Sequence, residues 1–238
     1  MSTSGRRRVG LGMVLLCLAA TLGIGLAVKL PCASGNWSDG RQYTRYCYSD
    51  IEPLLGAEQL SGGRLPYLDA CAPGPGECDE YPVLTMYAMR LAASASAGST
   101  GTAGFFFTNV LILTVAALVV AASAYALVGA RALYVALAPS LLLYAYMNWD
   151  LIAVAFATAA TLAFLRRRDV WAGVLLGLGA AAKLYPAFLL VPFVAERLRE
   201  REPDRGIHLA WAAVGTWLIA NLPFALAAPS RWWEFFRF

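Results

Sequence analysis

The chain has 238 residues, of which 59% are hydrophobic and only 14% are charged, whereas soluble domains average roughly 45–50% apolar and about 25% charged residues. Its net charge is +4, but the stretches 91–130, 132–149 and 209–230 contain no Asp, Glu, Lys or Arg. This pattern excludes a soluble enzyme, a disordered tail and a nucleic-acid-binding module. We therefore predict an all-α, polytopic membrane protein. In such a protein the excess of Lys and Arg indicates which segments face the cytoplasm.

The first predicted element is a membrane-spanning helix over residues 9–30, which matches the roughly 20 apolar residues needed to cross a bilayer. The preceding residues 1–8 contain three arginines, and positive-inside reasoning places this N-terminus in the cytoplasm. A cleaved signal peptide is the alternative. The apolar stretch is longer than is usual for one, and no clean small-residue cleavage site precedes Pro31. We favour an uncleaved signal anchor.

Residues 31–104 are predicted to form an extracytoplasmic loop. Its portion from Pro31 to Tyr81 has a local charge of −5 and holds four of the five cysteines. These four are Cys32, Cys47, Cys71 and Cys78. An even number of cysteines in one such loop predicts two disulfides, and we prefer Cys32–Cys47 with Cys71–Cys78 among the three possible pairings. Free thiols or a metal site are the alternative, which the lack of a nearby histidine disfavours.

Within this loop, residues 83–95 are predicted to form a helix that lies on the outer membrane surface. Val83, Tyr87 and Leu91 recur at helical spacing, but Arg90 sits in the middle of the segment. An Arg at the bilayer centre costs on the order of 2.5 kcal/mol or more, so an interfacial position is favoured. If the segment crossed the membrane instead, the later Arg-rich segments would fall outside, and we reject that alternative on charge.

Residues 105–228 are predicted to form the remaining transmembrane bundle. The predicted spans are 105–128, 133–147, 151–165 and 208–228, together with a short helical hairpin over 170–195. Lys183 interrupts the hairpin and is placed at its outer tip, because both flanks are rich in arginine and should be cytoplasmic. Residues 229–238 are then an extracytoplasmic stub. The chain ends there without a turn or a polar tail, so we expect it to be the N-terminal half of a longer protein.

Unusual polar groups collect at the outer ends of these elements. The candidates for a substrate site are Asp50, Asp69, Glu80, Tyr81, Asn148, Asp150, Lys183 and Tyr185. Each charged group has an ordinary explanation: the loop acids are solvated, Asp150 caps a helix and Lys183 snorkels to the interface. Together they favour a functional site. No nucleophile, phosphate-loop or zinc motif is found, so the available chemistry is carboxylate base catalysis and cationic recognition of an anion.

Five blocks of sequence carry a resemblance to a known family. They are residues 47–51 (CYSDI), 66–69 (PYLD), 80–85 (EYPVLT), 148–151 (NWDL) and 177–186 (GLGAAAKLYP). Taken together, and in this order, they resemble bacterial glycosyltransferase family 87. The resemblance implies a GT-C-like helical bundle in the plasma membrane. It also implies transfer of a sugar, with mannose expected, from a polyprenyl-phosphate donor to an extracytoplasmic glycan or glycolipid.

The resemblance also assigns roles to the candidate residues. Asp50 matches the catalytic base, Asp150 matches an acid that shapes the donor site, and Lys183 is placed to meet the lipid phosphate. The implied partners are the lipid-linked sugar, the acceptor and membrane lipids, with no nucleic acid. No cofactor is implied, and a divalent metal stays compatible with the pattern.

Two interpretations therefore stand at the level of sequence. The first is a membrane glycosyltransferase of which this chain, with fewer spans than the fold usually has, is the front half and inactive alone. The second is a non-enzymatic membrane protein, either half of a transporter or a structural subunit. Transporters place charges on broken helices near the midplane, whereas the acids here concentrate in a cysteine-bearing loop. That distribution favours the enzyme.

Overall fold

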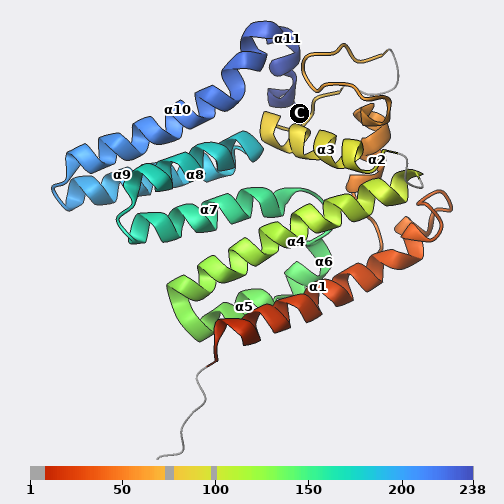
Figure 1. Cartoon of the computed structure of the whole chain (residues 1–238), viewed down its shortest axis with the longest axis horizontal. Coiled ribbons are helices and arrows are strands. Elements are labelled where there is room, and N and C mark those ends of the chain that lie inside the picture. The colour runs from red at the N-terminus through yellow and green to blue at the C-terminus, as the bar shows by residue number, and fades with distance from the viewer. Residues whose placement is uncertain (1–8, 73–77, 98–100, 238) are drawn as a thin grey trace, which may run out of the picture.

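The structure is a computed structural model that describes residues 9–72, 78–97 and 101–237. All regular structure in these ranges is helical, with no strand among them (Figure 1), as the sequence predicts. The arginine cluster at residues 6–8, which we expect in the cytoplasm, lies outside the described residues.

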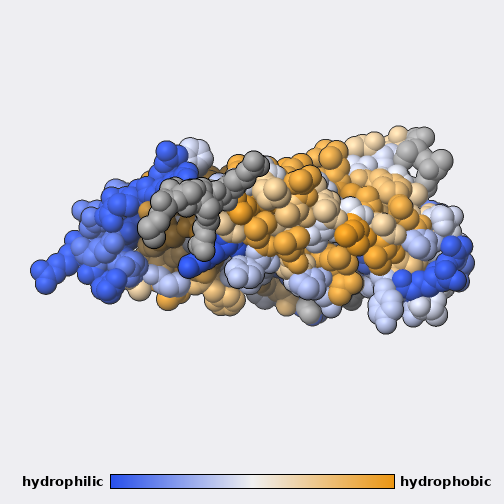
Figure 2. All heavy atoms as spheres, turned by 90° about the horizontal axis from the view of Figure 1, so that it is seen from below, coloured by the Kyte–Doolittle hydropathy of each residue, from blue (hydrophilic) through white to orange (hydrophobic). Residues whose placement is uncertain are grey.

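Long apolar helices dominate the architecture. Within the described residues, three helical segments are long and apolar enough to cross a membrane. They are α1 (Leu11–Ala33), the segment that starts in α4 (Gly101–Val128), and α10 (Pro203–Ala227). The shorter apolar helices α7 (Asp150–Leu165) and α8 (Asp169–Ala182) lie between α4 and α10 (Figure 1). Figure 2 shows a hydrophobic band with hydrophilic atoms at both ends of the long axis. Such a band suits lipid chains, and the protein is a membrane protein.

The return from α4 toward the other end of the molecule is made by short helices. They are η3 (Gly129–Ala132), α5 (Leu133–Ala136) and α6 (Pro139–Tyr144). The expectation of one spanning helix over residues 133–147 is therefore wrong. Pro139 has no N–H to donate and holds Ala138 in an extended conformation with ψ of 126°. α6 still packs tightly on α1, because a Cβ at Gly25 would lie 2.5 Å from the Leu142 carbonyl oxygen.

α8 and α10 pack closely because α8 presents small residues to its neighbour. A Cβ at Gly173 would lie 2.3 Å from the Leu209 carbonyl oxygen, and one at Gly177 would lie 2.5 Å from that of Ala213. Only glycine allows this approach of two helix backbones. After α8 the chain turns at Lys183 and comes back. The returning elements are η4 (Tyr185–Leu189) and α9 (Leu190–Arg199).

A buried ionic network closes one end of the bundle, which we call the arginine-rich end. Asp169 at the start of α8 forms ion pairs with Arg197 of α9 at 2.7 Å and with Arg205 of α10 at 2.6 Å. The Arg197 guanidinium also lies 4.0 Å from the ring centroid of Phe164 in α7 and donates to its carbonyl oxygen. The Asp169 carboxylate and the Arg197 guanidinium together thus join the ends of four helices.

The opposite end, which we call the loop end, carries the cysteine-bearing segment. Its short elements are η1 (Arg41–Tyr43), α2 (Ile51–Ala57) and η2 (Leu60–Gly62), followed by α3 (Val83–Ala95). α3 occupies the residues at which the pattern predicts a helix, while its position on a membrane surface stays a prediction. The described residues contain two disulfides, Cys32–Cys47 and Cys71–Cys78, so the preferred pairing is confirmed.

The last described residues fold back onto the loop end. They form α11 (Pro229–Trp232) and η5 (Glu234–Phe236), in the stretch expected to be a simple stub. Arg231 donates hydrogen bonds to the carbonyl oxygens of Tyr67 and Leu68, each at 2.7 Å, and the Phe235 side chain is buried. This segment therefore covers one side of the loop rather than extending away from it (Figure 1).

Candidate functional site

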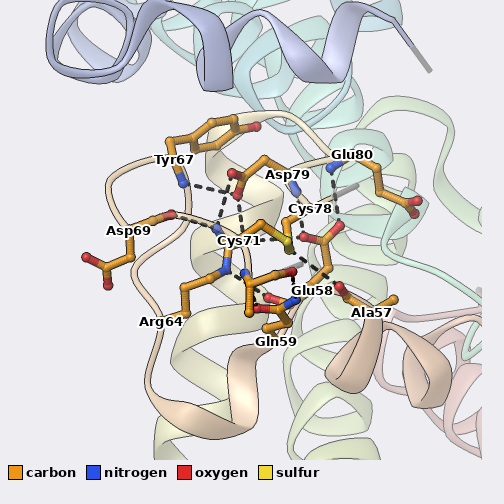
Figure 3. The surroundings of a disulfide bond; sticks show 11 residues. Ala57, Glu58, Gln59, Arg64, Tyr67, Asp69, Cys71, Cys78, Asp79 and Glu80 are labelled. Carbon is orange, nitrogen blue, oxygen red and sulfur yellow. Dashed lines mark hydrogen bonds and ion pairs between the residues drawn. A yellow bond between two sulfur atoms is a disulfide. The ribbon is translucent and has the colours of Figure 1, made fainter. Parts of the chain in front are cut away.

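Three buried charged residues hold the second half of the loop in place. Arg64 lies 2.7 Å from an Asp79 carboxylate oxygen and 3.5 Å from one of Glu58 (Figure 3). The Glu58 carboxylate also accepts hydrogen bonds from the backbone N–H groups of Asp79 at 2.6 Å and Glu80 at 3.2 Å. Burial raises the pKa of Glu58 to about 7. The cluster fixes the backbone that leads to Glu80 and Tyr81.

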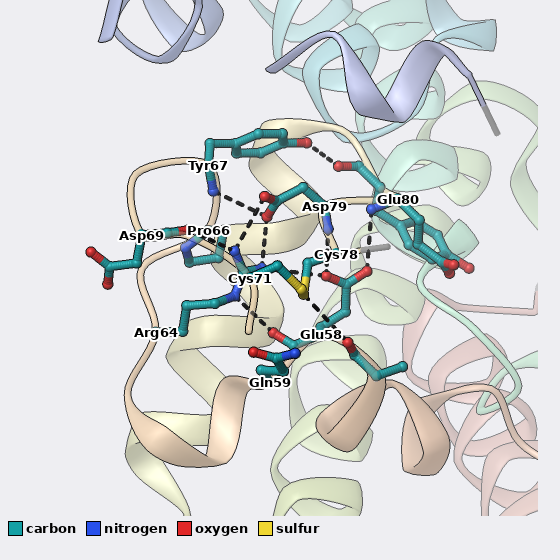
Figure 4. Close-up of polar contacts among 12 residues, drawn as sticks. Glu58, Gln59, Arg64, Pro66, Tyr67, Asp69, Cys71, Cys78, Asp79 and Glu80 are labelled. Carbon is teal, nitrogen blue, oxygen red and sulfur yellow. Dashed lines mark hydrogen bonds and ion pairs between the residues drawn. A yellow bond between two sulfur atoms is a disulfide. The ribbon is translucent and has the colours of Figure 1, made fainter. Parts of the chain in front are cut away.

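Tyr81 is positioned by contacts from several segments. Its carbonyl oxygen accepts a hydrogen bond from the Tyr67 hydroxyl (Figure 4), and its ring meets that of Trp149 edge-on at 5.7 Å between centroids. Trp149 is buried and donates from Nε1 to Asn109 Oδ1 of α4 at 2.7 Å. Tyr81 therefore lies where the loop meets the start of α7.

Asp50 is held beside α1 and the end of the α6 segment. Its backbone N–H donates to the Met147 carbonyl oxygen at 2.8 Å. The Tyr48 hydroxyl interacts with the Asp50 carboxylate, and this interaction together with burial raises the pKa of Tyr48 to about 12. Lys29 of α1 is only 2% exposed, donates to the Tyr48 carbonyl oxygen and interacts electrostatically with Asp50. A buried cation thus accompanies this carboxylate.

Asp150 and Lys183 form an ion pair that joins the start of α7 to the hairpin turn. The side chains are 46% and 40% exposed, so the pair is open to solvent. The Asp150 N–H donates to Asn148 Oδ1 at 3.1 Å, which satisfies one free donor at the start of α7. On the other side, Thr85 of α3 donates to the carbonyl oxygen of Ala182 at 2.7 Å and so holds the residue before Lys183.

These groups converge around Tyr81. Burial raises the pKa of the Tyr81 hydroxyl, and the nearby carboxylates of Asp50, Glu80 and Asp150 raise it further. Burial also raises the pKa of Glu80, with Asp50 adding to the effect. Tyr185 follows Lys183 in the turn and interacts with Asp150. Acids from the loop and an acid–lysine pair from the helices thus share one place.

The structure brings together seven of the eight residues that the sequence singles out. These seven are Asp50, Glu80, Tyr81, Asn148, Asp150, Lys183 and Tyr185. Asp69 is apart from them: its carboxylate accepts the Leu65 N–H at 2.7 Å and points away from the charged cluster in Figure 3. Sequence reasoning missed Lys29, although it is the single charged residue in an otherwise apolar helix, which was the available signal.

An apolar groove runs beside the hairpin. It is lined by residues of α8, η4, α9 and α10, among them Ala180, Ala187, Leu190 and Trp217. We call it the α8–α10 groove. Because Ala180 and Ala187 flank Lys183 in the chain, one end of the groove lies near the Asp150–Lys183 pair. Among the described residues, no group of three or more His, Cys, Asp or Glu side chains is placed to hold a metal ion.

The helices, the apolar band and the polar site at the loop end define an all-helical membrane protein with an acid- and lysine-bearing site. The family to which it belongs follows from sequence comparison. The profile of glycosyltransferase family 87 matches residues 81–238, which is more than half of the chain. The chain therefore belongs to glycosyltransferase family 87 and is a membrane glycosyltransferase. No curated protein and no solved structure matches it. The match begins at Tyr81, so Asp50 and both disulfides precede it.

Proposed function

We propose that the protein transfers a sugar, with mannose expected, from a polyprenyl-phosphate donor to a hydroxyl group of an extracytoplasmic glycan or glycolipid. The observation that carries the proposal is the convergence of Asp50 with the Asp150–Lys183 pair around Tyr81. Such a transfer needs a base for the acceptor hydroxyl and a cation for the departing phosphate. The site contains both kinds of group.

In the proposed reaction, Asp50 is the general base. Its carboxylate takes the proton of the acceptor hydroxyl as the acceptor oxygen forms a bond to the anomeric carbon of the donor sugar. The bond from that carbon to the phosphate oxygen breaks, with inversion at the carbon, and the polyprenyl phosphate leaves with the electron pair. Tyr48 and Lys29 orient the Asp50 carboxylate through the contacts described above.

The donor phosphate is assigned to Lys183. Its ammonium group is paired with Asp150 but is 40% exposed, so a phosphate oxygen can approach it from solvent. A cation at that point stabilises the charge that develops on the leaving group. The polyprenyl chain is assigned to the α8–α10 groove, whose apolar lining suits a hydrocarbon. Glu80, Tyr81, Asn148, Asp150 and Tyr185 complete the proposed substrate site, and Asp69 is not included in it.

The proposed topology places the loop end outside the cytoplasm and the arginine-rich end inside it. The protein is then a multi-pass plasma-membrane protein with a cytoplasmic N-terminus. Two features support this orientation: arginines are retained on the cytoplasmic side, and disulfides persist in oxidising compartments. The ion pairs join the arginine-bearing ends of α8, α9 and α10, and the disulfides lie in the loop and at the end of α1. These two regions lie at opposite ends of the molecule (Figure 1).

The test is a transfer assay with the protein at its full native length in membrane vesicles. Radiolabelled polyprenyl-phosphate mannose is the donor, and label in extractable glycans and glycolipids is measured. Asp50→Asn should lower the rate by about 10²–10⁴-fold, the range for loss of a general base. Asp204→Asn, a change of an exposed acid at the arginine-rich end, is the control.

Two results would contradict the proposal. Wild-type activity in the Asp50→Asn protein would remove Asp50 from the mechanism. If wild-type vesicles transferred no label, the assignment of a polyprenyl-phosphate mannose donor would fail.

A further inference from the structure

A second hollow at the loop end is lined by aromatic side chains. It has a volume of about 410 Å³, and four tyrosines form much of its wall: Tyr43, Tyr46, Tyr48 and Tyr144. Gln42 and Thr44 supply polar groups at the same surface. We call it the tyrosine groove. Its size falls in the range of roughly 300–1,000 Å³ that is usual for small-molecule sites, and its lining combines aromatic faces with a few polar groups as such sites do.

The two walls of the groove are fixed to the rest of the fold. One wall precedes Cys47, whose disulfide ties it to the end of α1, and Arg41 donates to the Pro31 carbonyl oxygen at 2.8 Å. The other wall is formed by the end of α6 and the residues after it, where the Tyr146 carbonyl oxygen accepts a hydrogen bond from the Ser49 hydroxyl at 2.9 Å. Both walls of the groove are therefore held in place by contacts within this chain.

The groove adjoins the proposed base. Tyr48 is one of the residues that line the groove, and its hydroxyl interacts with the Asp50 carboxylate. Met147 lines the opposite wall, and its carbonyl oxygen accepts the Asp50 N–H at 2.8 Å. Two lining residues of the groove are thus in contact with Asp50, the residue proposed to take the acceptor proton.

The side chains that line the tyrosine groove indicate which class of ligand it could bind. The described lining residues carry no charged side chain, so they offer nothing that would attract a phosphate or an anionic lipid headgroup. Tyr43 and Tyr46 are 78% and 86% exposed, so their rings are largely open to solvent. A sugar ring presents apolar C–H faces that pack on aromatic rings, and its hydroxyls pair with phenol, amide and hydroxyl groups. A neutral saccharide fits this surface.

We propose that the tyrosine groove is the subsite that binds the acceptor saccharide. This proposal rests on the proposed function, because it gives the groove the sugar whose hydroxyl faces Asp50. It divides the site in two: the donor phosphate lies at Lys183, and the acceptor sugar lies on the tyrosines beside α1. The competing explanation is that these tyrosines form part of an interfacial aromatic belt, with no ligand.

The first test separates acceptor from donor binding in the transfer assay. The double variant Tyr43→Ala/Tyr46→Ala removes the two exposed rings and leaves Tyr48 and Asp50 in place. We expect the KM for the acceptor to rise by about tenfold, a usual effect of truncating aromatic anchors, with the KM for the donor unchanged. Tyr134→Ala is the matched control, since Tyr134 is 83% exposed and belongs to α5, away from the groove.

The second test measures binding without catalysis. The Asp50→Asn protein in lipid nanodiscs is probed by saturation-transfer NMR with octyl mannoside, octyl glucoside and octyl galactoside. At least one of the three should receive saturation at its ring protons, and the signal should be lost when Tyr43→Ala/Tyr46→Ala is added and kept when Tyr134→Ala is added.

The outcomes distinguish this proposal from the one on which it rests. An acceptor KM that does not change in the double variant, or hexoside binding that does not depend on the two tyrosines, overturns the acceptor subsite and favours the aromatic belt. Full transfer activity in the Asp50→Asn protein overturns the proposed role of Asp50, whatever the tyrosine variants do.

Discussion

Glu58 should make the stability of the loop depend on pH. Its carboxylate is 1% exposed, and Arg64 lies closer to Asp79 than to Glu58. Burial therefore dominates, and the pKa of Glu58 rises from its ordinary 4.5 to about 7. The perturbation that tests this is Glu58→Gln, which keeps the shape of the side chain and removes the titration.

The sign and size follow from proton linkage. Because the folded pKa is above the unfolded one, the folded loop binds the proton more tightly, and this contribution to stability is fully present below about pH 4.5. It is lost as pH rises through about 7. A rise in pKa from 4.5 to about 7 corresponds to about 3 kcal/mol of opening free energy.

Hydrogen exchange with mass spectrometry measures that opening free energy. Peptides that cover residues 51–72 and 78–95 are compared at pH 4.5 and pH 8, with intrinsic exchange rates corrected for pH. The wild-type protein should be more stable at pH 4.5 by about 3 kcal/mol, whereas Glu58→Gln should lose most of this difference. Asp69→Asn, a change of an exposed acid in the same loop, should behave as wild type. Equal pH dependence in the wild-type and Glu58→Gln proteins would refute the reasoning.

Two further predictions concern the helix bundle. Asp169→Asn leaves the buried Arg197 without its closest carboxylate and should destabilise the protein by about 3–5 kcal/mol. A thermal unfolding midpoint that falls no further than that of Asp204→Asn would contradict this. Gly177→Leu places a side chain against the Ala213 carbonyl and should cost at least about 1–3 kcal/mol. Gly215→Leu is its control, because no atom lies within 4 Å of a Cβ there, and equal melting of the two variants would count against tight α8–α10 packing.

Much of the fold could be predicted because its signals are local. Helical spacing marks α3, and two close cysteine pairs in one loop predict the disulfides. The break between α5 and α6 also has a local cause in Pro139, but the apolar composition of residues 133–147 is equally typical of one continuous span. Hydropathy alone does not distinguish one span from two short helices.

The parts that could not be predicted depend on contacts between distant residues. The role of Lys29 beside Asp50 can be seen only in the folded chain, where the disulfide holds the segment with Tyr48 and Asp50 against α1. Asp69 has the same sequence character as Asp50, yet its carboxylate is used within its own turn. The ion pair of Asp150 with Lys183 joins residues 33 positions apart. Composition and motifs indicate which types of residue form such a site. They do not indicate which of these residues contact one another in the folded protein.

The Cys32–Cys47 bond has a consequence for where this enzyme can mature. The bond closes three residues before Asp50 and anchors that stretch to the membrane helix. In the proposed topology this loop is exported, so we expect a copy whose loop stays where thiols are kept reduced to lack this covalent anchor and to hold the Asp50 stretch by hydrogen bonds alone. We therefore expect the proposed base to gain its covalent anchor only after the loop has been exported and oxidised.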